Sequence, residues 1–377
     1  MKILIINWQD IKNPFGGGAE VHMHEIFRLV AAAGHDVTIF SCMFDGAADF
    51  EDIDGIKIIR KGSRNLFNFV VKKMYKKQFR HENYDIIIDD INKIPFYTPR
   101  YVKEPLLAIS HHFFGKSIFK EAGLISGLYV YASEYLVNSV YKNTPFAVVS
   151  QSTLDEFEER GFDTKRFSII QNAITQESYP MKIGEKTKHP TIVYFGRLKK
   201  YKSPDHLVKA FAIVSDIIRD AELHFVGKGD FKPELEKLCK QLGVFDKTVF
   251  HGFVSEEKKV ELLSQSYCAV NTSVKEGWGI TNIEANACGT PVISSDVPGL
   301  RDSIKKDVSG QLYEYGNIEE LADLIYTMLT DNSHRQHLSE GALEWAESFT
   351  WKESAELMIK KCEEVIADHR KKLGNKI

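Results

Sequence analysis

The chain has 377 residues, of which 43% are hydrophobic and 27% charged, and its formal net charge at pH 7 is -3. This length exceeds what one hydrophobic core usually organises, so we expect two domains. The near-neutral charge and globular composition argue against nucleic acid as the main partner.

The five cysteines are scattered without metal-ligand spacing, at positions 42, 239, 268, 288 and 362. We therefore expect reduced thiols in a cytoplasmic protein. The apolar run over residues 1–7 is too short for a signal peptide and predicts a first strand. No apolar run reaches membrane-spanning length, so any membrane contact should be peripheral.

Short apolar runs alternate with helical periodicity along the chain, as in parallel sheets built from βαβ units. A helix is predicted over about 19–33, where Gly34 would end it. The predicted strands are 2–7, 36–41, 56–60, 86–89, 106–110 and 146–150, then 191–195, 222–226, 248–251, 268–271 and 291–294. A last amphipathic helix, from Trp351 to about Lys372, could cross back onto the first domain.

Residues 176–190 contain Pro180, Gly184 and Pro190, interrupt the periodicity and predict a linker. The predicted domains are 1–175, completed by the C-terminal helix at about 355–377, and 176–354. The fold class is α/β, with two Rossmann-like, doubly wound parallel-sheet domains. Such domains would face each other across a cleft at the carboxyl ends of their strands.

Three consecutive glycines, Gly16 to Gly18, follow the first strand and open the first helix. They differ from the spaced G-x-G-x-x-G of dinucleotide binders, and no ribose-binding acid follows the second strand, which argues against an oxidoreductase. A phosphate could bind this helix N-terminus. The alternative is a flexible loop.

His111 and His112 follow the strand 106–110, where a histidine could hydrogen-bond a sugar hydroxyl or transfer a proton. The sequence places no third metal ligand beside them. The acidic pair Asp89-Asp90 also fits a strand end without metal. We expect no metal site.

Arg197 ends the first strand of the second domain, and Lys202 follows five residues later. The Arg197 fork can grip phosphate oxygens and Lys202 adds a compact charge, which suits a departing nucleoside diphosphate. The alternative is a solvated basic loop.

Glu276 and Glu284 stand eight positions apart, with a glycine-containing turn and a helix start between them. Free N–H groups there suit a diphosphate, and Gly277 and Gly279 would let a ligand lie against the backbone. Carboxylates also accept hydrogen bonds from neutral hydroxyls, so one could meet a sugar and the other a ribose. The alternative is a helix start with an incidental acidic pair.

Residues 57–80 are basic, contain no acid, and interleave their cations with apolar side chains. The cations include Arg60, Lys61, Arg64, Lys72, Lys73, Lys76, Lys77 and Arg80. Phe113, Phe114, Ile118 and Phe119 form a second apolar cluster. These segments predict a surface for anionic lipid headgroups; the alternative is an ordinary helix with a solvated basic face.

Taken together, these motifs resemble the family 4 retaining glycosyltransferases of GT-B fold. The resemblance rests on Gly-Gly-Ala-Glu at 17–20, Asn172-Ala-Ile174, Gly196-Arg197-Leu198 with Lys202, and Glu276-Gly-Trp-Gly with Glu284. It implies transfer of a hexosyl group from a UDP- or GDP-hexose to an acceptor hydroxyl, with retention and without a metal or other cofactor. The acceptor could be a lipid-linked or cell-envelope glycan at the inner face of the membrane.

The resemblance also implies roles for single residues. Arg197 and Lys202 would bind the diphosphate, Glu276 the sugar hydroxyls and Glu284 the ribose. The remaining positions would contact the donor or the acceptor. They are Gly17 and Gly18, the backbone of Gly277, Trp278, Gly279, Ile280 and Thr281, and Val254 at the base. The family's histidine maps to His111, with His112 as the adjacent alternative.

Two departures from the family pattern are visible. Trp278 replaces a frequent phenylalanine and should keep a flat apolar wall, and Asn172-Ala173 replaces asparagine-glycine. Three rival functions stay open. One is an oxidoreductase, although the spaced glycine fingerprint and the ribose-binding acid are absent, and another is a sugar phosphorylase, for which no cofactor-bearing lysine is apparent. The third is a non-catalytic nucleotide-sugar-binding protein.

Overall fold

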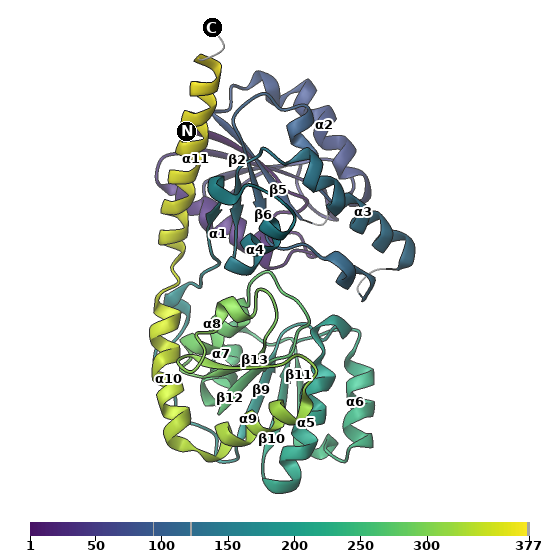
Figure 1. Cartoon of the computed structure of the whole chain (residues 1–377), viewed down its shortest axis with the longest axis vertical. Coiled ribbons are helices and arrows are strands. Elements are labelled where there is room, and N and C mark those ends of the chain that lie inside the picture. The colour runs from purple at the N-terminus through teal and green to yellow at the C-terminus, as the bar shows by residue number, and fades with distance from the viewer. Residues whose placement is uncertain (93, 121–122, 375–377) are drawn as a thin grey trace. The chain divides into compact units, whose positions relative to one another are not determined.

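The computed structural model describes residues 1–92, 94–120 and 123–374. The chain forms two compact units (Figure 1). Unit 1 comprises Met1–Ala173 and Trp351–Ile377, and unit 2 comprises Ile174–Thr350. Each unit is built on one sheet, and the predicted α/β class with two parallel-sheet domains is confirmed.

Unit 1 contains a sheet of strand order β3-β4-β2-β1-β5-β6-β7-β8, parallel except for the antiparallel pair β3 and β4. The strands are β1 (Lys2–Ile6), β2 (Asp36–Ser41), β3 (Phe50–Ile53), β4 (Ile56–Arg60), β5 (Ile86–Ile91), β6 (Leu106–Ser110), β7 (Phe146–Val148) and β8 (Ser168–Ile169). Its α-helices are α1 (Gly18–Ala32), α2 (Phe67–Lys77), α3 (Leu124–Val140), α4 (Gln151–Glu159) and α11 (Trp351–Gly374).

The long helix α11 returns to unit 1 and runs beside α1, as expected from its amphipathic pattern (Figure 1). Ser354 Oγ donates a hydrogen bond to the carbonyl of Gln171, 2.9 Å away. The buried apolar side of α11 includes Met358, Cys362 and Ile366. Both ends of unit 1 in the sequence therefore contribute to one core.

Unit 2 contains an all-parallel sheet of order β11-β10-β9-β12-β13-β14. Its strands are β9 (Thr191–Phe195), β10 (Glu222–Val226), β11 (Thr248–Gly252), β12 (Cys268–Asn271), β13 (Val292–Ser295) and β14 (Gly310–Tyr313). The helices are α5 (Pro204–Ile217), α6 (Lys232–Gln241), α7 (Glu256–Gln265), α8 (Ile280–Ala287), α9 (Ile318–Thr330) and α10 (Asn332–Glu347).

Residues 176–190, which we expected to form a linker, instead pack on unit 2. The Met181 amide donates to the carbonyl of Ala287 at 3.0 Å. Lys186 Nζ donates to the Ser264 carbonyl and to Thr290 Oγ1, both at 3.0 Å. Burial lowers the pKa of Lys186 to about 8. The segment breaks the periodicity because it is an irregular, anchored connection.

The basic segment 57–80 also differs from expectation. Arg60 is buried in an ion pair with Asp10, with Nε and Oδ2 2.7 Å apart, and so is no surface cation. The apolar side of α2 faces the core through Phe67, Met74 and Tyr75. The predicted apolar cluster is likewise mostly internal, because Phe113, Phe114 and Ile118 are buried.

Among the described residues, no helix has the length and hydrophobicity needed to cross a bilayer.

Candidate functional site

The candidate site in unit 2 gathers at the carboxyl ends of β9 and β12. Lys202 Nζ lies 2.5 Å from Glu276 Oε1, and Ser273 Oγ donates to the same oxygen at 2.8 Å. Burial works against the charge of Lys202, but the attraction of Glu276 outweighs it and raises the Lys202 pKa. Two residues predicted to act on different parts of a donor are thus joined in one ion pair.

Arg197 lies exposed beside this pair, where its Nη2 donates to the Tyr201 hydroxyl at 3.1 Å. The turn that carries it is fixed by backbone contact with the neighbouring loop, since the Leu198 amide donates to the Lys228 carbonyl at 2.9 Å. A Cβ at Gly229 would overlap the Leu198 backbone. Gly229 therefore positions the arginine, a role that its sequence context did not reveal.

Glu284, on α8, is held by two groups from other elements. The Tyr179 hydroxyl donates to Glu284 Oε1 at 2.6 Å, and Lys259 Nζ lies 2.8 Å from the same oxygen. Lys259 is only 5% exposed. Its burial disfavours the charge, but Glu284 and Glu256 outweigh that effect and raise the Lys259 pKa. Sequence reasoning missed both partners of Glu284.

The turn before α8 is shaped by packing within the protein. A Cβ at Gly279 would overlap Ser303 Oγ and come within 2.9 Å of Leu300 Cδ2, so the missing side chain makes room for unit 2 itself. Trp278 is 6% exposed, and its ring centroid lies 5.3 Å from that of Phe349. The indole thus packs within unit 2, and the flat apolar wall expected at Trp278 stays a prediction.

The remaining predicted positions of unit 2 are Ile280, Thr281 and Val254. Ile280 and Thr281 form the first turn of α8 and are partly buried. Asn271 Nδ2 donates to Thr281 Oγ1 at 3.3 Å. Val254 follows β11 and packs partly against an apolar cluster of unit 2, while its neighbour Phe253 is exposed.

In unit 1, the start of α1 is already occupied by a carboxylate. The Gly17 amide donates to Glu20 Oε2 at 2.7 Å, and Asn92 Nδ2 donates to Glu20 Oε1 at 3.3 Å. Burial raises the pKa of Glu20. A side chain of the protein thus takes the Gly17 amide in this structure, and phosphate binding at this helix N-terminus stays a prediction. A Cβ at Gly18 would meet nothing within 4 Å.

His111 lies in a buried cluster at the carboxyl ends of β5 and β6. Its Nε2 is 3.1 Å from Asp90 Oδ1, and Thr153 Oγ1 donates to its carbonyl at 3.0 Å. Burial of His111 lowers its pKa, but the opposing attraction of Asp90 is larger in sum and the pKa is raised. The ring of the adjacent His112 lies tilted against that of Phe114, with centroids 4.5 Å apart. Asp90 is thus the carboxylate partner of His111.

A second histidine, His22 of α1, faces His111 with ring centroids 5.2 Å apart. Its Nε2–H donates to the carbonyl of Ile170 at 3.0 Å. Burial, followed by the nearby charge of His111, lowers the pKa of His22 to about 3. His22 is therefore neutral at physiological pH.

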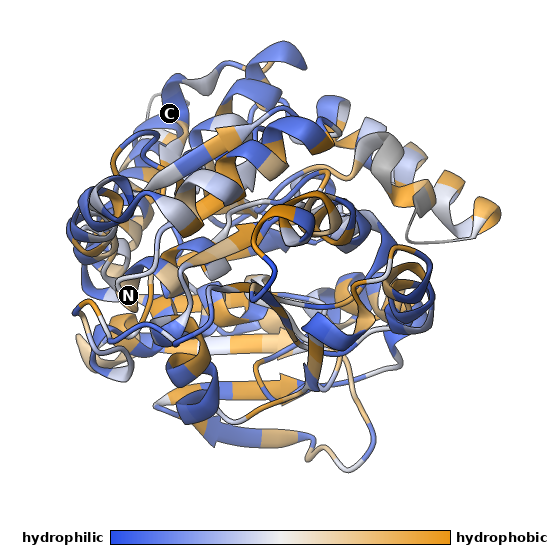
Figure 2. Cartoon of the chain, turned by 90° about the horizontal axis from the view of Figure 1, so that it is seen from below, coloured by the Kyte–Doolittle hydropathy of each residue, from blue (hydrophilic) through white to orange (hydrophobic). Residues whose placement is uncertain are grey.

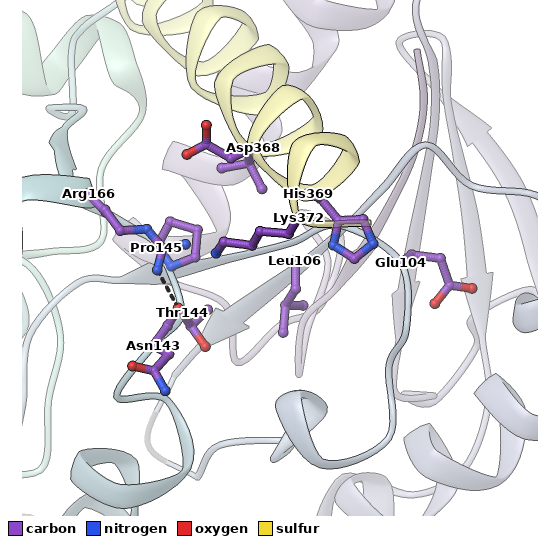
Figure 3. A pocket seen from close by; sticks show the side chains of 10 residues that line it. Glu104, Leu106, Asn143, Thr144, Pro145, Arg166, Asp368, His369 and Lys372 are labelled. Atoms are coloured by element: carbon purple, nitrogen blue, oxygen red, sulfur yellow. Dashed lines mark hydrogen bonds between the residues drawn. The ribbon is translucent and has the colours of Figure 1, made fainter. Parts of the chain in front are cut away.

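A separate pocket of unit 1 lies at the amino-terminal ends of β6 and β7 (Figure 3). Its lining includes Leu106, Pro145, Arg166, His369 and Lys372. Arg166 Nη1 donates to the Asn143 carbonyl at 2.7 Å. Since His111 follows the other end of β6, this pocket is distinct from the candidate site.

Two family models match this chain in succession. Residues 16–178 match the model for Glycosyltransferase Family 4, and residues 175–345 match the model for glycosyl transferases group 1. The chain belongs to the family 4 glycosyltransferases of GT-B fold. The resemblance seen in its sequence motifs is confirmed.

Relatives of this glycosyltransferase include an uncharacterized glycosyltransferase of Methanocaldococcus jannaschii, which is 28% identical and matches 93% of this chain and 95% of its own. A GDP-mannose-dependent alpha-(1-6)-phosphatidylinositol monomannoside mannosyltransferase of Mycobacterium tuberculosis is 24% identical over 88% of this chain and 90% of its own. A D-inositol 3-phosphate glycosyltransferase of Xylanimonas cellulosilytica is 30% identical, but the match covers 53% of this chain and 48% of that relative.

Solved structures show the same fold. A sucrose-phosphate synthase from Thermosynechococcus elongatus superposes with a TM-score of 0.79 at 19% identity, covering 97% of this glycosyltransferase and 99% of that chain. The Anabaena protein HepE, solved in complex with UDP and glucose, superposes with a TM-score of 0.74 at 20% identity, covering 97% and 100%.

Proposed function

We propose that this glycosyltransferase moves a hexosyl group from a UDP- or GDP-hexose to an acceptor hydroxyl, with retention at the anomeric carbon and without a metal ion. The observation that carries the proposal is the grouping of Arg197, Lys202 and Glu276 beyond the carboxyl ends of β9 and β12, where the chain leads into α8.

In this proposal the diphosphate binds Arg197 and Lys202, with the first amides of α8 adding hydrogen-bond donors. As the bond to the anomeric carbon breaks, negative charge grows on the diphosphate, and these fixed cations stabilise it. When the diphosphate binds, Lys202 Nζ moves partly away from Glu276 and contacts a phosphate oxygen. The carboxylate oxygens of Glu276 then accept hydrogen bonds from sugar hydroxyls, which are uncharged donors.

Glu284 binds the ribose hydroxyls. Its carboxylate, which Lys259 holds in place, can accept hydrogen bonds from two hydroxyl groups. The backbone near Val254 contacts the base. Related proteins support either nucleotide, because the mannosyltransferase is GDP-mannose-dependent by name and the Anabaena protein was solved with UDP.

The acceptor hydroxyl attacks from the face that the diphosphate leaves, and a leaving phosphate oxygen takes its proton. A covalent double displacement would need a carboxylate beneath the anomeric carbon, whereas Glu276 is assigned to hydroxyl binding. On unit 1, His111 hydrogen-bonds a sugar hydroxyl, and Asp90 holds the orientation of the imidazole. Gly18, where an added Cβ would meet nothing within 4 Å, leaves room for a substrate at the start of α1, and Gly17 would contact that substrate once Glu20 releases its amide.

We further propose a lipid-linked or cell-envelope glycan as the acceptor and a cytoplasmic site of action at the membrane surface. The mannosyltransferase relative, whose name specifies a phosphatidylinositol monomannoside, supports this acceptor class.

The test is a transfer assay with UDP- and GDP-hexoses, with and without a chelator, that follows release of nucleoside diphosphate. Turnover with one base, unaffected by chelator, is expected, and the product's anomeric configuration should match that of the donor by NMR. A chain that binds nucleotide sugar but releases no diphosphate with any acceptor would be the non-catalytic binding protein. Inversion of configuration would overturn the retaining assignment.

A further inference from the structure

The solvent-facing side of α3 is apolar. The most exposed large side chains are Leu124, Ile125, Leu128, Tyr129 and Tyr135, with Ile125 87% and Leu124 77% exposed. We call these five residues the α3 face. The inward side of the helix is formed instead by Gly127, Val130, Ser133, Glu134 and Val137. Figure 2 shows α3 mainly in orange and pale colours.

This polarity is the reverse of an ordinary surface helix, which turns its charged residues to water. Glu134 is the one charged residue between Leu124 and Val140, all of which are described, and it points inward. Its carboxylate oxygens accept hydrogen bonds from the backbone amides of Phe114 and Gly115, at N···O distances of 2.6 and 2.9 Å. A contiguous apolar surface of this kind marks an interaction site.

A short chain of contacts joins α3 to the cationic side of α2. Ser133 hydrogen-bonds the hydroxyl of Tyr97, and the Arg100 guanidinium lies 5.7 Å from the Tyr97 ring centroid. One residue further on, the Tyr101 ring lies 5.8 Å from Lys72 Nζ. The outward side of α2 carries four exposed lysines, Lys72, Lys73, Lys76 and Lys77.

We propose that the α3 face inserts into the interface of a lipid bilayer that contains anionic lipid, with the α2 lysines contacting its headgroups. Leucine, isoleucine and tyrosine suit the boundary between headgroups and acyl chains. Exposed lysines on a helix connected to α3 add attraction to anionic lipid. The proposal deepens the proposed function, because a bilayer is where a lipid-linked acceptor would lie.

A second copy of the chain is a less suitable occupant. In a dimer formed through the α3 face, the lysine-rich α2 helices of the two copies would approach each other. Like charges placed together at an interface disfavour association, whereas an anionic bilayer complements the same charges.

The experiment is co-sedimentation of the full chain with vesicles of phosphatidylcholine alone or with phosphatidylglycerol, without donor sugar. Wild type is expected to bind the anionic vesicles more strongly. The double variant Ile125→Asp/Leu128→Asp should lose at least about tenfold in binding, because it puts two charges on the inserting face. Ile217→Asp, a matched change at a 64% exposed isoleucine of α5 in unit 2, should bind as wild type does.

The contribution of α2 is tested by Lys72→Glu/Lys76→Glu, which should abolish the preference for anionic vesicles. The matched variant Lys237→Glu, at an exposed lysine of α6, should keep it. Retained nucleotide binding and circular dichroism show that each variant folds.

Wild-type protein that stays in the supernatant with both vesicle types would overturn the proposal. So would a double variant that binds as wild type does. A concentration-dependent dimer that the double variant abolishes, without vesicle binding by wild type, would assign the α3 face to a second copy. None of these results depends on transferase activity, so failure here leaves the proposed reaction standing.

Discussion

Glu276 and Lys202 form a partly buried ion pair whose members have different proposed partners, sugar and diphosphate. Glu276→Gln keeps the shape of the side chain but removes its charge and one of the two oxygens that accept hydrogen bonds from sugar hydroxyls. We expect kcat to fall about 100-fold, in the range found for loss of one transition-state contact. Affinity for the free nucleoside diphosphate should change little.

The measurement compares initial rates and calorimetric nucleotide binding for this variant and for Glu234→Gln, an exposed glutamate of α6. A full transfer rate in Glu276→Gln would remove Glu276 from the mechanism.

The Asp90–His111 pair gives a pH-dependent prediction. The folded-state pKa of His111 is raised, so its protonated form stabilises the fold. That contribution is complete below the unfolded pKa, about 6.5, and is lost as pH rises through the folded pKa. Asp90→Asn should therefore lower the thermal midpoint more at pH 5.5 than at pH 8.5.

Calorimetric scans of wild type and Asp90→Asn at the two pH values test this. A difference in midpoint that is the same at both pH values would mean that Asp90 does not act through the charge of His111. Asp163→Asn, at a surface turn of the same unit, is the control.

At this scale the sequence predicted which residues gather but not how they pair. Arg197 and Lys202 are close in sequence, and their position after a strand was enough to place both at the sheet edge. The partner of Lys202 lies 74 residues away and that of Lys259 lies 25 residues away. Such pairs depend on how loops of different strands meet, which periodicity does not encode.

The start of α8 depends on a tight fit between elements. Gly279→Ala should destabilise the protein by about 1–3 kcal/mol, the usual cost of overpacking, because its Cβ would overlap Ser303 Oγ. Gly18→Ala, at the first residue of α1, meets open space and should be neutral or slightly stabilising.

Thermal midpoints of the two variants test this contrast. Equal midpoints would mean that the turn before α8 adjusts freely, contrary to the packing described.

Among the elements, the strands with continuous apolar runs were predicted within one or two residues, including β1, β9 and β10. The strands β3 and β14 were missed because Phe50–Ile53 is half acidic and Gly310–Tyr313 begins with glycine. The α3 face was missed for another reason. A helix that is apolar on both sides resembles a core helix in sequence, and only the structure shows which side faces water.

For the whole molecule, the alternation of strands and helices predicted two parallel-sheet units, and the C-terminal helix was correctly expected to join the first. The anchoring of 176–190 on unit 2 was not predictable, since prolines and glycines mark irregular backbone whether it is free or packed. Nucleotide specificity also stays undetermined by the sequence, because backbone groups such as those near Val254 are the same for any residue type.

The central claim is that unit 2 binds the diphosphate of a nucleotide sugar through Arg197. Its most direct test is isothermal titration of UDP and GDP into wild type and Arg197→Ala, an exposed position whose substitution should leave the fold intact. We predict that one nucleotide binds wild type and that the variant loses about 30-fold in affinity, equivalent to about 2 kcal/mol for a charge-assisted contact. Equal affinity in both proteins, or no binding of either nucleotide, would contradict the account.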